Sequence, residues 1–298
     1  CTLRDGGYYN NWKFNNSTIN NYLQSMSKAN IDIVEIGFRF IKKNLIFGKL
    51  ANTHDEFLNK LEIPNNIKLA IMINGEEYNN DKLLLDQLFL QKKNSKIDLI
   101  RIAINIKYFF KIKYIAKYLK KKKYHIAINL MQSNDIKKTD LIKLIKEVKC
   151  WNCCDVLYFA DSLGTMDSKE VRRISNILFE YWGDKFGFHS HNNRGLALTN
   201  SLEALKHKAK FIDSTVLGMG RGAGNTPTES LILELNKLKM HNSKVKELYN
   251  CFDDFRKLQK IYEWGPNIFY HIASINKIHP TYIQTLLSDK RYSYNQIL

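Results

Sequence analysis

The stretch Gly187-Phe188-His189-Ser190-His191-Asn192-Asn193 places two histidines two positions apart at the end of an apolar run. In a β-strand, residues i and i+2 point to the same side, so we expect both imidazoles to converge on one point. Such a pair suits a divalent metal ion. Histidines on strands are nevertheless more often structural than metal-binding, so the rest of the chain has to decide between the two interpretations.

Short apolar runs alternate with amphipathic helical segments along residues 1–240. The runs are rich in Ile, Val and Leu, which is typical of parallel strands that are covered on both faces. Eight strands, each followed by a helix, predict an α/β fold of the (β/α)8 type, a TIM barrel. The predicted strands are Cys1–Asp5, Ile31–Phe38, Ile67–Ile73, Asp98–Ile104, His125–Met131, Asp155–Asp161, Lys185–His191 and Phe211–Gly218. The main predicted helices are Asn16–Ala29, Lys82–Gln91, Lys107–Lys122, Lys137–Val148, Ser168–Tyr181 and Leu196–Lys208.

A doubly wound open sheet is the alternative architecture. It would need no eighth strand, and it usually carries a phosphate-binding glycine loop after its first strand, for which Gly6-Gly7 is too short. After about residue 241 the pattern stays helical, with interruptions at Pro266 and Pro280. The sequence therefore predicts a catalytic barrel domain at residues 1–240 and a short C-terminal helical appendage at residues 241–298.

The composition restricts the classes of partner. The formal net charge is +17 over 298 residues, but the lysines are spread out and lack interleaved aromatic residues, so we expect no nucleic-acid partner. No apolar run reaches the ~18 residues of a membrane span. The five cysteines show no disulfide-like spacing, which predicts a reducing, cytoplasmic setting. Because the chain opens on Cys1 within a predicted strand, we expect it to be a fragment.

Polar side chains recur where the predicted strands end. In a barrel these positions all lie at the mouth formed by the carboxyl ends of the strands, where the chemistry of this fold is found. They are Arg4, Asp5, Arg39, Asn74, Asn105, Asn129, Asp161, Ser162, His189 and His191.

Three of these motifs are expected to meet. Strands one, seven and eight are neighbours in a closed barrel, and the glycine-rich loop Gly218–Asn225 lets backbone approach a ligand closely. Asp5, the two histidines and Asn225 would then surround one point. One carboxylate and two imidazoles, with positions left for water or substrate, suit Mg²⁺ or Mn²⁺.

Four segments resemble the signature of the DRE-TIM metallolyases, in order and at matching strand positions. This superfamily includes hydroxymethylglutaryl-CoA lyase, the isopropylmalate and homocitrate synthases, and 4-hydroxy-2-oxovalerate aldolase. The aldolase branch is the most similar, because Asp161-Ser162-Leu163-Gly164-Thr165-Met166 resembles its strand-six motif. The four segments are Leu3–Gly6, Val34–Phe38, Phe188–Ala197 and Gly220–Pro227.

The resemblance implies a role for each matching residue. Asp5, His189 and His191 would bind a divalent metal, Mn²⁺ or Mg²⁺, with Asn225 as a further ligand or as a residue that orients one. Arg4 would stabilise an enolate, in line with charge stabilisation by a clamp at a developing oxyanion. The substrate-binding set implied in this way is Arg4, Glu35, Ser162, Asn193 and Arg221.

One position departs from the family pattern. The aldolase branch carries an acid/base histidine three residues after the ligand aspartate, whereas this chain has Tyr8. A phenol with a pKa near 10 is a poor base at neutral pH unless its surroundings lower that pKa. Either Tyr8 is the catalytic group, or His54 replaces it from the segment Arg39–Asp55, which could fold over the mouth as a lid, or the reaction differs.

The sequence thus predicts a metal-dependent aldolase or lyase that cleaves or forms a C–C bond of a small anionic 2-oxo acid through an enolate. The alternatives are a Claisen-type acyl-CoA condensing enzyme or acyl-CoA lyase of the same superfamily and, from another class, an amidohydrolase-like metal hydrolase, whose H-x-H pair belongs on strand one. We also expect no membrane partner, and we expect either a homodimer or, as in the family, an aldehyde-processing partner enzyme.

Overall fold

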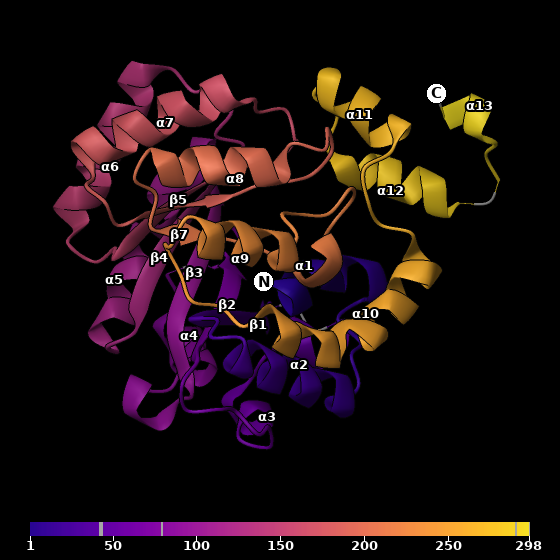
Figure 1. Ribbon diagram of the computed structural model, residues 1–298. Helices are drawn as coiled ribbons and strands as arrows, with labels where there is room; N and C mark the ends of the chain where they lie inside the picture. Colours follow the sequence, from indigo (N-terminus) through magenta and orange to yellow (C-terminus); the bar gives the residue numbers. More distant parts are fainter. Residues whose placement is uncertain (42–43, 79, 290, 298) are drawn as a thin grey trace.

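A curved parallel sheet forms the centre of the molecule, in a computed structural model that describes residues 1–41, 44–78, 80–289 and 291–297. Each strand pairs with the next one along the chain, giving the order β1 to β7 (Figure 1). Parallel neighbours joined by crossover helices are the arrangement that the alternating pattern predicts. The strands are β1 (Ile33–Phe38), β2 (Lys68–Asn74), β3 (Ile97–Asn105), β4 (His125–Met131), β5 (Val156–Ala160), β6 (Phe186–His189) and β7 (Phe211–Ile212).

Helices cover the outer side of this sheet (Figure 1). Several begin at a side-chain cap: Asn15, Asp81 and Asp167 each accept a hydrogen bond from a backbone N–H in the first turn. The helices are α1 (Thr2–Asn10), α2 (Asn16–Lys28), α3 (Asp55–Leu58), α4 (Lys82–Leu88), α5 (Lys113–Lys121), α6 (Lys138–Trp151), α7 (Ser168–Tyr181), α8 (Ala197–Lys206), α9 (Thr228–Lys237), α10 (Tyr249–Tyr262), α11 (Ile268–Ile275), α12 (Pro280–Ser288) and α13 (Tyr294–Ile297).

The first predicted strand is wrong, because residues 2–10 form helix α1. The backbone N–H of Asp5 donates to the carbonyl of Cys1, which is a helical i→i−4 bond, and Asn11 ends the helix in the left-handed conformation. The five residues Cys1–Asp5 include only two apolar side chains, which is too little periodicity to distinguish a strand from a helix turn. The last predicted strand is also shorter than expected, since β7 holds two residues and a 3-10 turn follows at Val216–Gly218.

Within the described part of the chain the structure is therefore a seven-stranded curved sheet and not a closed eight-stranded barrel. Helix α1 lies against β1 and is tied to the segment that follows β7. The α-amino group of Cys1 donates to the carbonyl of Ser214 at 2.8 Å, and the N–H of Val216 donates to the Thr2 hydroxyl at 3.0 Å. A cavity of about 530 Å³ opens at the amino end of the strands, lined by residues of β1 and β7 among others.

The C-terminal helices reach the loops at the carboxyl end of the sheet. Helix α10 packs on α2. On α11, the Ser274 hydroxyl donates to the carbonyl of Gly164. On α12, the side-chain oxygen of Gln284 accepts from the N–H of Gly222, and its side-chain nitrogen donates to the carbonyl of Tyr8. The division into domains at residues 240 and 241 stays a prediction. Among the described residues, no helix combines the length and the apolar character that a membrane crossing requires.

Candidate active site

Asp5, His189 and His191 converge as the sequence predicts. One ligand-type atom from each lies within 4.8 Å of the other two, and all three side chains are buried. Asp5 stands in the first turn of α1, His189 ends β6, and His191 lies just beyond that strand. The imidazole centroids are 5.2 Å apart with ring planes at 73°. Strand β6 thus ends between the two histidines, and His191 belongs to an isolated bridge just beyond it.

The glycine-rich loop closes this group from the side. His191 forms an antiparallel bridge with Asn225, whose side-chain amide donates to the Asp5 carboxylate. A side chain at Gly220 would meet that same carboxylate at 2.8 Å and the Asn225 amide at 2.4 Å. The loop consequently needs glycine here so that its backbone can pass close to the ligand group.

The residues fit a divalent metal ion by an observation independent of the motif. The Nδ1 atom of His191 and the Oδ1 atom of Asn225 are buried without a hydrogen-bond partner. Buried polar atoms are nearly always paired, so two atoms without partners on residues next to one carboxylate favour a bound cation. An imidazole, a carboxylate and an amide oxygen form a donor set that Mg²⁺ or Mn²⁺ accepts.

The electrostatics keep these groups in the protonation states that a metal requires. Burial alone would raise the pKa of Asp5, but Arg4 and the two histidines hold it below its usual value. Burial lowers the pKa of His191 well below its usual value, and His189 lowers it further. Asp5 is therefore a carboxylate and His191 a neutral imidazole at neutral pH.

A cavity of about 290 Å³ opens at the carboxyl ends of the strands, beside these residues. Strand-end residues from the sheet form much of its wall, as the sequence predicts, and Asp5 and Asn225 are buried behind it. The predicted site residues that line it are Arg4, Tyr8, Ser162, His189, His191 and Arg221.

Arg4 lines this cavity and keeps one hydrogen-bond donor without a partner. Its Nε donates to Glu35 at 2.7 Å and its Nη1 to Asp5 at 2.5 Å, while its Nη2 is buried without a partner. Burial alone would lower the pKa of Arg4, but Glu35 and then Asp5 raise it above its usual value. The guanidinium is thus a fixed cation with one free arm, which suits an anionic ligand.

Two charged residues of the site were missed by the sequence analysis. Arg101 on β3 pairs with Glu35 at 3.3 Å and with Asp213 at 2.8 Å. Asp213, just after β7, hydrogen-bonds Nδ1 of His189 at 2.9 Å. Burial alone would raise the pKa of Asp213, but Arg101 and His189 lower it below its usual value. The sequence signal that could have identified them is a charged residue inside a predicted strand: Arg101 within Asp98–Ile104 and Asp213 within Phe211–Gly218.

Tyr8 lies in the cavity wall among other rings. Arg221 stacks over its ring at 4.6 Å, and Trp12 and Phe38 approach it edge-on. Burial raises the pKa of Tyr8 even though Arg221 opposes the shift. The phenol therefore stays protonated at neutral pH and can donate a hydrogen bond, but it is not a ready base.

A third imidazole in the cavity wall is His279, which no motif indicated. It caps α12, more than eighty positions after His191 in sequence, and its Nδ1 accepts a 3.3 Å hydrogen bond from the N–H of Thr281. Burial and then Arg221 lower its pKa to about 4. His54, the predicted substitute for Tyr8, does not line this cavity.

The remaining predicted residues are distributed as follows. Ser162 lies in the wall, and its hydroxyl accepts the N–H of Gln132 at 3.0 Å. Glu35 faces Arg4 and Arg101, and Asn193 is buried against Gly164, so neither lines the cavity. The predicted lid, Arg39–Asp55, includes residues 42 and 43, which lie outside the described residues.

A family model described as HMGL-like matches residues 98–263, more than half of the chain. The chain belongs to the HMGL-like family. This confirms the family that the four motifs indicated.

Named relatives agree with this assignment. The chain is 29% identical over 240 residues to a 4-hydroxy-2-oxovalerate aldolase of Pelotomaculum thermopropionicum and 26% identical over 238 residues to an oxaloacetate decarboxylase of Mycobacterium tuberculosis. Each alignment covers 79% of this chain and 68% of the relative. These names support the predicted class, a carbon–carbon lyase, and do not favour an amidohydrolase.

Solved structures give the same result for the fold. The N-terminal domain of a "putative aldolase" from Bacteroides vulgatus superimposes with a TM-score of 0.87 at 32% identity, covering 100% of this chain and 97% of that one. The HMG-CoA lyase of Brucella melitensis matches with a TM-score of 0.69 at 13% identity, covering 87% and 96%. The second likeness concerns the fold alone.

Proposed function

We propose that this protein is a divalent-metal-dependent aldolase that cleaves or forms a C–C bond of a small 2-oxo acid. The observation that carries the proposal is the convergence of Asp5, His189 and His191 beside the free Nη2 arm of Arg4. Cation ligands and a fixed cationic donor in one cavity suit a substrate that has a carboxylate and a keto oxygen next to each other.

The metal would be Mg²⁺ or Mn²⁺, held by Asp5, His189 and His191, with the free Oδ1 of Asn225 as a further ligand. When bound, such an ion supplies Lewis-acid polarisation of the keto group. The low pKa of Asp5 and the neutral state of His191 keep both side chains ready to bind it.

Arg4 is proposed to stabilise the enolate. In the cleavage direction the bond between C3 and C4 breaks, the 4-hydroxyl loses its proton and becomes an aldehyde, and the bonding electrons form the enolate of pyruvate, which is then protonated. The buried Nη2 of Arg4 would donate to the oxygen that gains charge, while Glu35 holds the guanidinium in place.

Ser162 and Arg221 are proposed to hold the substrate from two sides of the same cavity. Ser162 would donate its hydroxyl proton to the carboxylate, since its oxygen already accepts from Gln132. Arg221 adds positive charge above Tyr8. A volume of about 290 Å³ is at the lower limit for small-ligand pockets, which favours a short acid. Asn193 stays a prediction as a substrate ligand.

Proton transfer at the substrate hydroxyl is assigned to Tyr8, with His279 as the second candidate. Both line the cavity, and burial keeps Tyr8 protonated and His279 neutral. Because Nδ1 of His279 accepts the N–H of Thr281, its proton resides on Nε2, so both groups are donors in this state. They therefore suit protonation of the new alkoxide in the bond-forming direction.

Decarboxylation of oxaloacetate is a second candidate activity, favoured by the relative with that name. It would pass through the same enolate and release the same product, so it needs no change to the site. The predicted cytoplasmic setting is supported by the five free cysteines. A homodimer and an aldehyde-processing partner enzyme stay predictions.

The test is an assay of pyruvate release. The protein is stripped with EDTA, reloaded with Mn²⁺ or Mg²⁺, and offered a panel of 4-hydroxy-2-oxo acids together with oxaloacetate. We expect metal-dependent release of pyruvate from at least one hydroxy acid. A metal-loaded protein that released pyruvate only from oxaloacetate would be a decarboxylase, and one that released none from the whole panel would refute the proposal.

A further inference from the structure

Six buried ionisable side chains form a closed ring beneath the cavity. The ring runs from Asp5 through Arg4, Glu35, Arg101 and Asp213 to His189 and returns to Asp5. Its successive contacts measure 2.5 Å, 2.7 Å, 3.3 Å, 2.8 Å, 2.9 Å and 3.8 Å. Three carboxylates face two guanidinium groups, so the ring with a neutral His189 carries one negative charge.

The ring separates two cavities. Arg4 and His189 line the cavity at the carboxyl ends of the strands. Glu35, Arg101 and Asp213 line the larger one at the amino ends. The proposed metal ligands are consequently supported from below by charged groups that have no contact with the substrate cavity.

The two ring nitrogens of His189 face different carboxylates. Nδ1 lies 2.9 Å from Oδ2 of Asp213, and Nε2 lies 3.8 Å from Oδ2 of Asp5. An ionised carboxylate can only accept hydrogen bonds, so Nδ1 carries the proton, and in a neutral imidazole Nε2 then keeps a free lone pair. Metal-binding histidines commonly use this arrangement, in which a carboxylate holds the nitrogen remote from the ion.

Arg101 in turn fixes the orientation of Asp213. Its Nη2 contacts the same carboxylate oxygen that receives His189. The guanidinium is itself confined, because it lies 4.1 Å from the centre of the Tyr158 ring and pairs with Glu35. Because Glu35 and the Tyr158 ring hold the Arg101 guanidinium in place, this guanidinium in turn holds the Asp213 carboxylate in one position.

We propose that Asp213, clamped by Arg101, is a positioning residue that selects Nε2 of His189 as the nitrogen facing the metal. It acts through His189 and touches neither substrate nor ion. This inference rests on the metal site of the proposed function.

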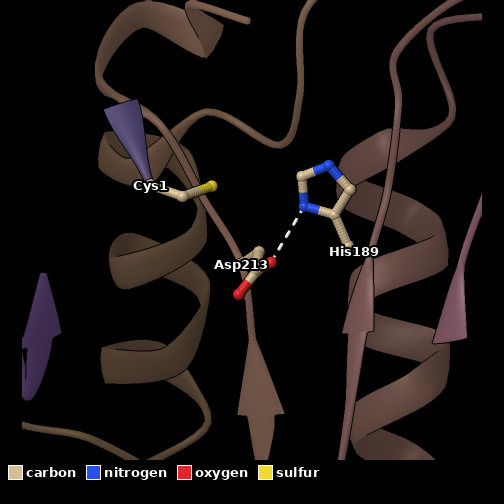
Figure 2. Close-up of side chains that lie close together, drawn as sticks. All are labelled: Cys1, His189 and Asp213. Atoms are coloured by element: carbon tan, nitrogen blue, oxygen red, sulfur yellow. Dashed lines mark hydrogen bonds and ion pairs between the residues drawn. The ribbon is translucent and has the colours of Figure 1, made fainter. Parts of the chain in front are cut away.

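The competing arrangement is a second metal site on the other side of His189. Figure 2 shows Cys1, His189 and Asp213 gathered together, and one ligand-type atom from each lies within 4.8 Å of the others. That site would need a bare Nδ1. The hydrogen bond from Nδ1 to Asp213, drawn as a dashed line, already uses this nitrogen, which favours positioning over metal binding.

The first test needs no metal. In the stripped protein labelled with ¹⁵N-histidine, NMR should show His189 with its proton on Nδ1. Asp213→Ala should remove this tautomer preference, and Asp213→Asn should largely keep it, because the amide oxygen can still accept the proton. A wild-type His189 protonated on Nε2 would refute the proposal.

The second test measures Mn²⁺ affinity by electron paramagnetic resonance. Asp213→Ala should weaken Mn²⁺ binding by roughly 10- to 100-fold, as loss of an outer-sphere partner usually does, and Arg101→Met should weaken it less. Two controls should stay within about 2-fold of wild type: Asp55→Asn, which breaks a buried pair with Arg39, and Cys1→Ser, which removes the thiol of the competing site.

The outcomes separate the two hypotheses. Wild-type affinity in both folded Asp213→Ala and Arg101→Met, or a loss of affinity in Cys1→Ser, would refute the positioning role. If Asp213→Ala fails to fold, Asp213→Asn and Arg101→Met carry the comparison. A wild-type protein that bound no Mn²⁺ would refute the metal site of the proposed function, while the NMR result would still decide the tautomer.

Discussion

Two buried arginine–carboxylate groups occupy neighbouring parts of this molecule, and they differ in what they leave unpaired. Arg39, just after β1, donates to the backbone carbonyls of Thr53 and Leu88 and pairs with Asp55. Arg4, on α1, pairs with Glu35 and Asp5 but keeps a buried Nη2 without a partner. Both side chains are almost fully buried.

Burial of charge therefore does not by itself mark a functional site. The Arg39 group is saturated and joins two loops to the sheet, so it contributes to the fold. The Arg4 group lies beside a cavity, and His191 and Asn225 next to it also have buried atoms without a partner. Unsatisfied buried atoms gathered beside one cavity are the better indication of a ligand.

The largest expected effect is loss of metal binding. Asp5→Ala and His191→Ala each remove a proposed ligand, so we expect Mn²⁺ affinity to fall by more than the roughly 100-fold seen for loss of an outer-sphere partner. Isothermal titration of stripped protein measures this. Arg39→Met is the matched variant: it should lower the free energy of unfolding by about 3–5 kcal/mol and leave Mn²⁺ affinity unchanged. Equal metal affinity in all three variants and wild type would remove the distinction between the two groups.

The next effect concerns turnover. Arg4→Lys keeps the charge but loses the planar fork, so we expect kcat for pyruvate release to fall by roughly 10²- to 10³-fold, the usual loss for a donor at a developing oxyanion. Arg39→Lys should leave kcat close to wild type and lower only the urea midpoint. The contrast fails if both lysine variants lose turnover to the same degree.

The smallest effect is on stability at low pH. Burial and then Arg221 lower the pKa of His279 to about 4, below the ordinary value near 6.5. Between these values the unfolded chain binds more protons, so His279 reduces stability as pH falls from about 6.5 through about 4.

We therefore expect His279→Gln to lose less stability than wild type between pH 7 and pH 4.5, by on the order of 1 kcal/mol because the group is partly exposed. Urea unfolding at several pH values measures the difference. If His279→Gln loses as much stability as wild type over this pH range, the cavity wall does not lower the pKa of His279.

The α/β class, the alternation of strands and helices, the family, and the three residues that meet at the candidate metal site were all predictable from the sequence. These follow from local periodicity and from short motifs, since parallel strands covered on both faces are continuously apolar and their polar residues fall at the ends. Asp5, His189 and His191 could be named because each stands in such a motif.

The remaining features depend on contacts between distant parts of the chain. The tertiary structure made residues 2–10 a helix, paired Arg39 away from the cavity, and brought Arg101, Asp213 and His279 to the site from distant parts of the chain. The physical reason is that a closed ring of charges and an orphaned hydrogen-bond donor depend on which side chains meet in space. Hydrophobic periodicity fixes which face of a strand is buried, but not which buried charge finds which partner.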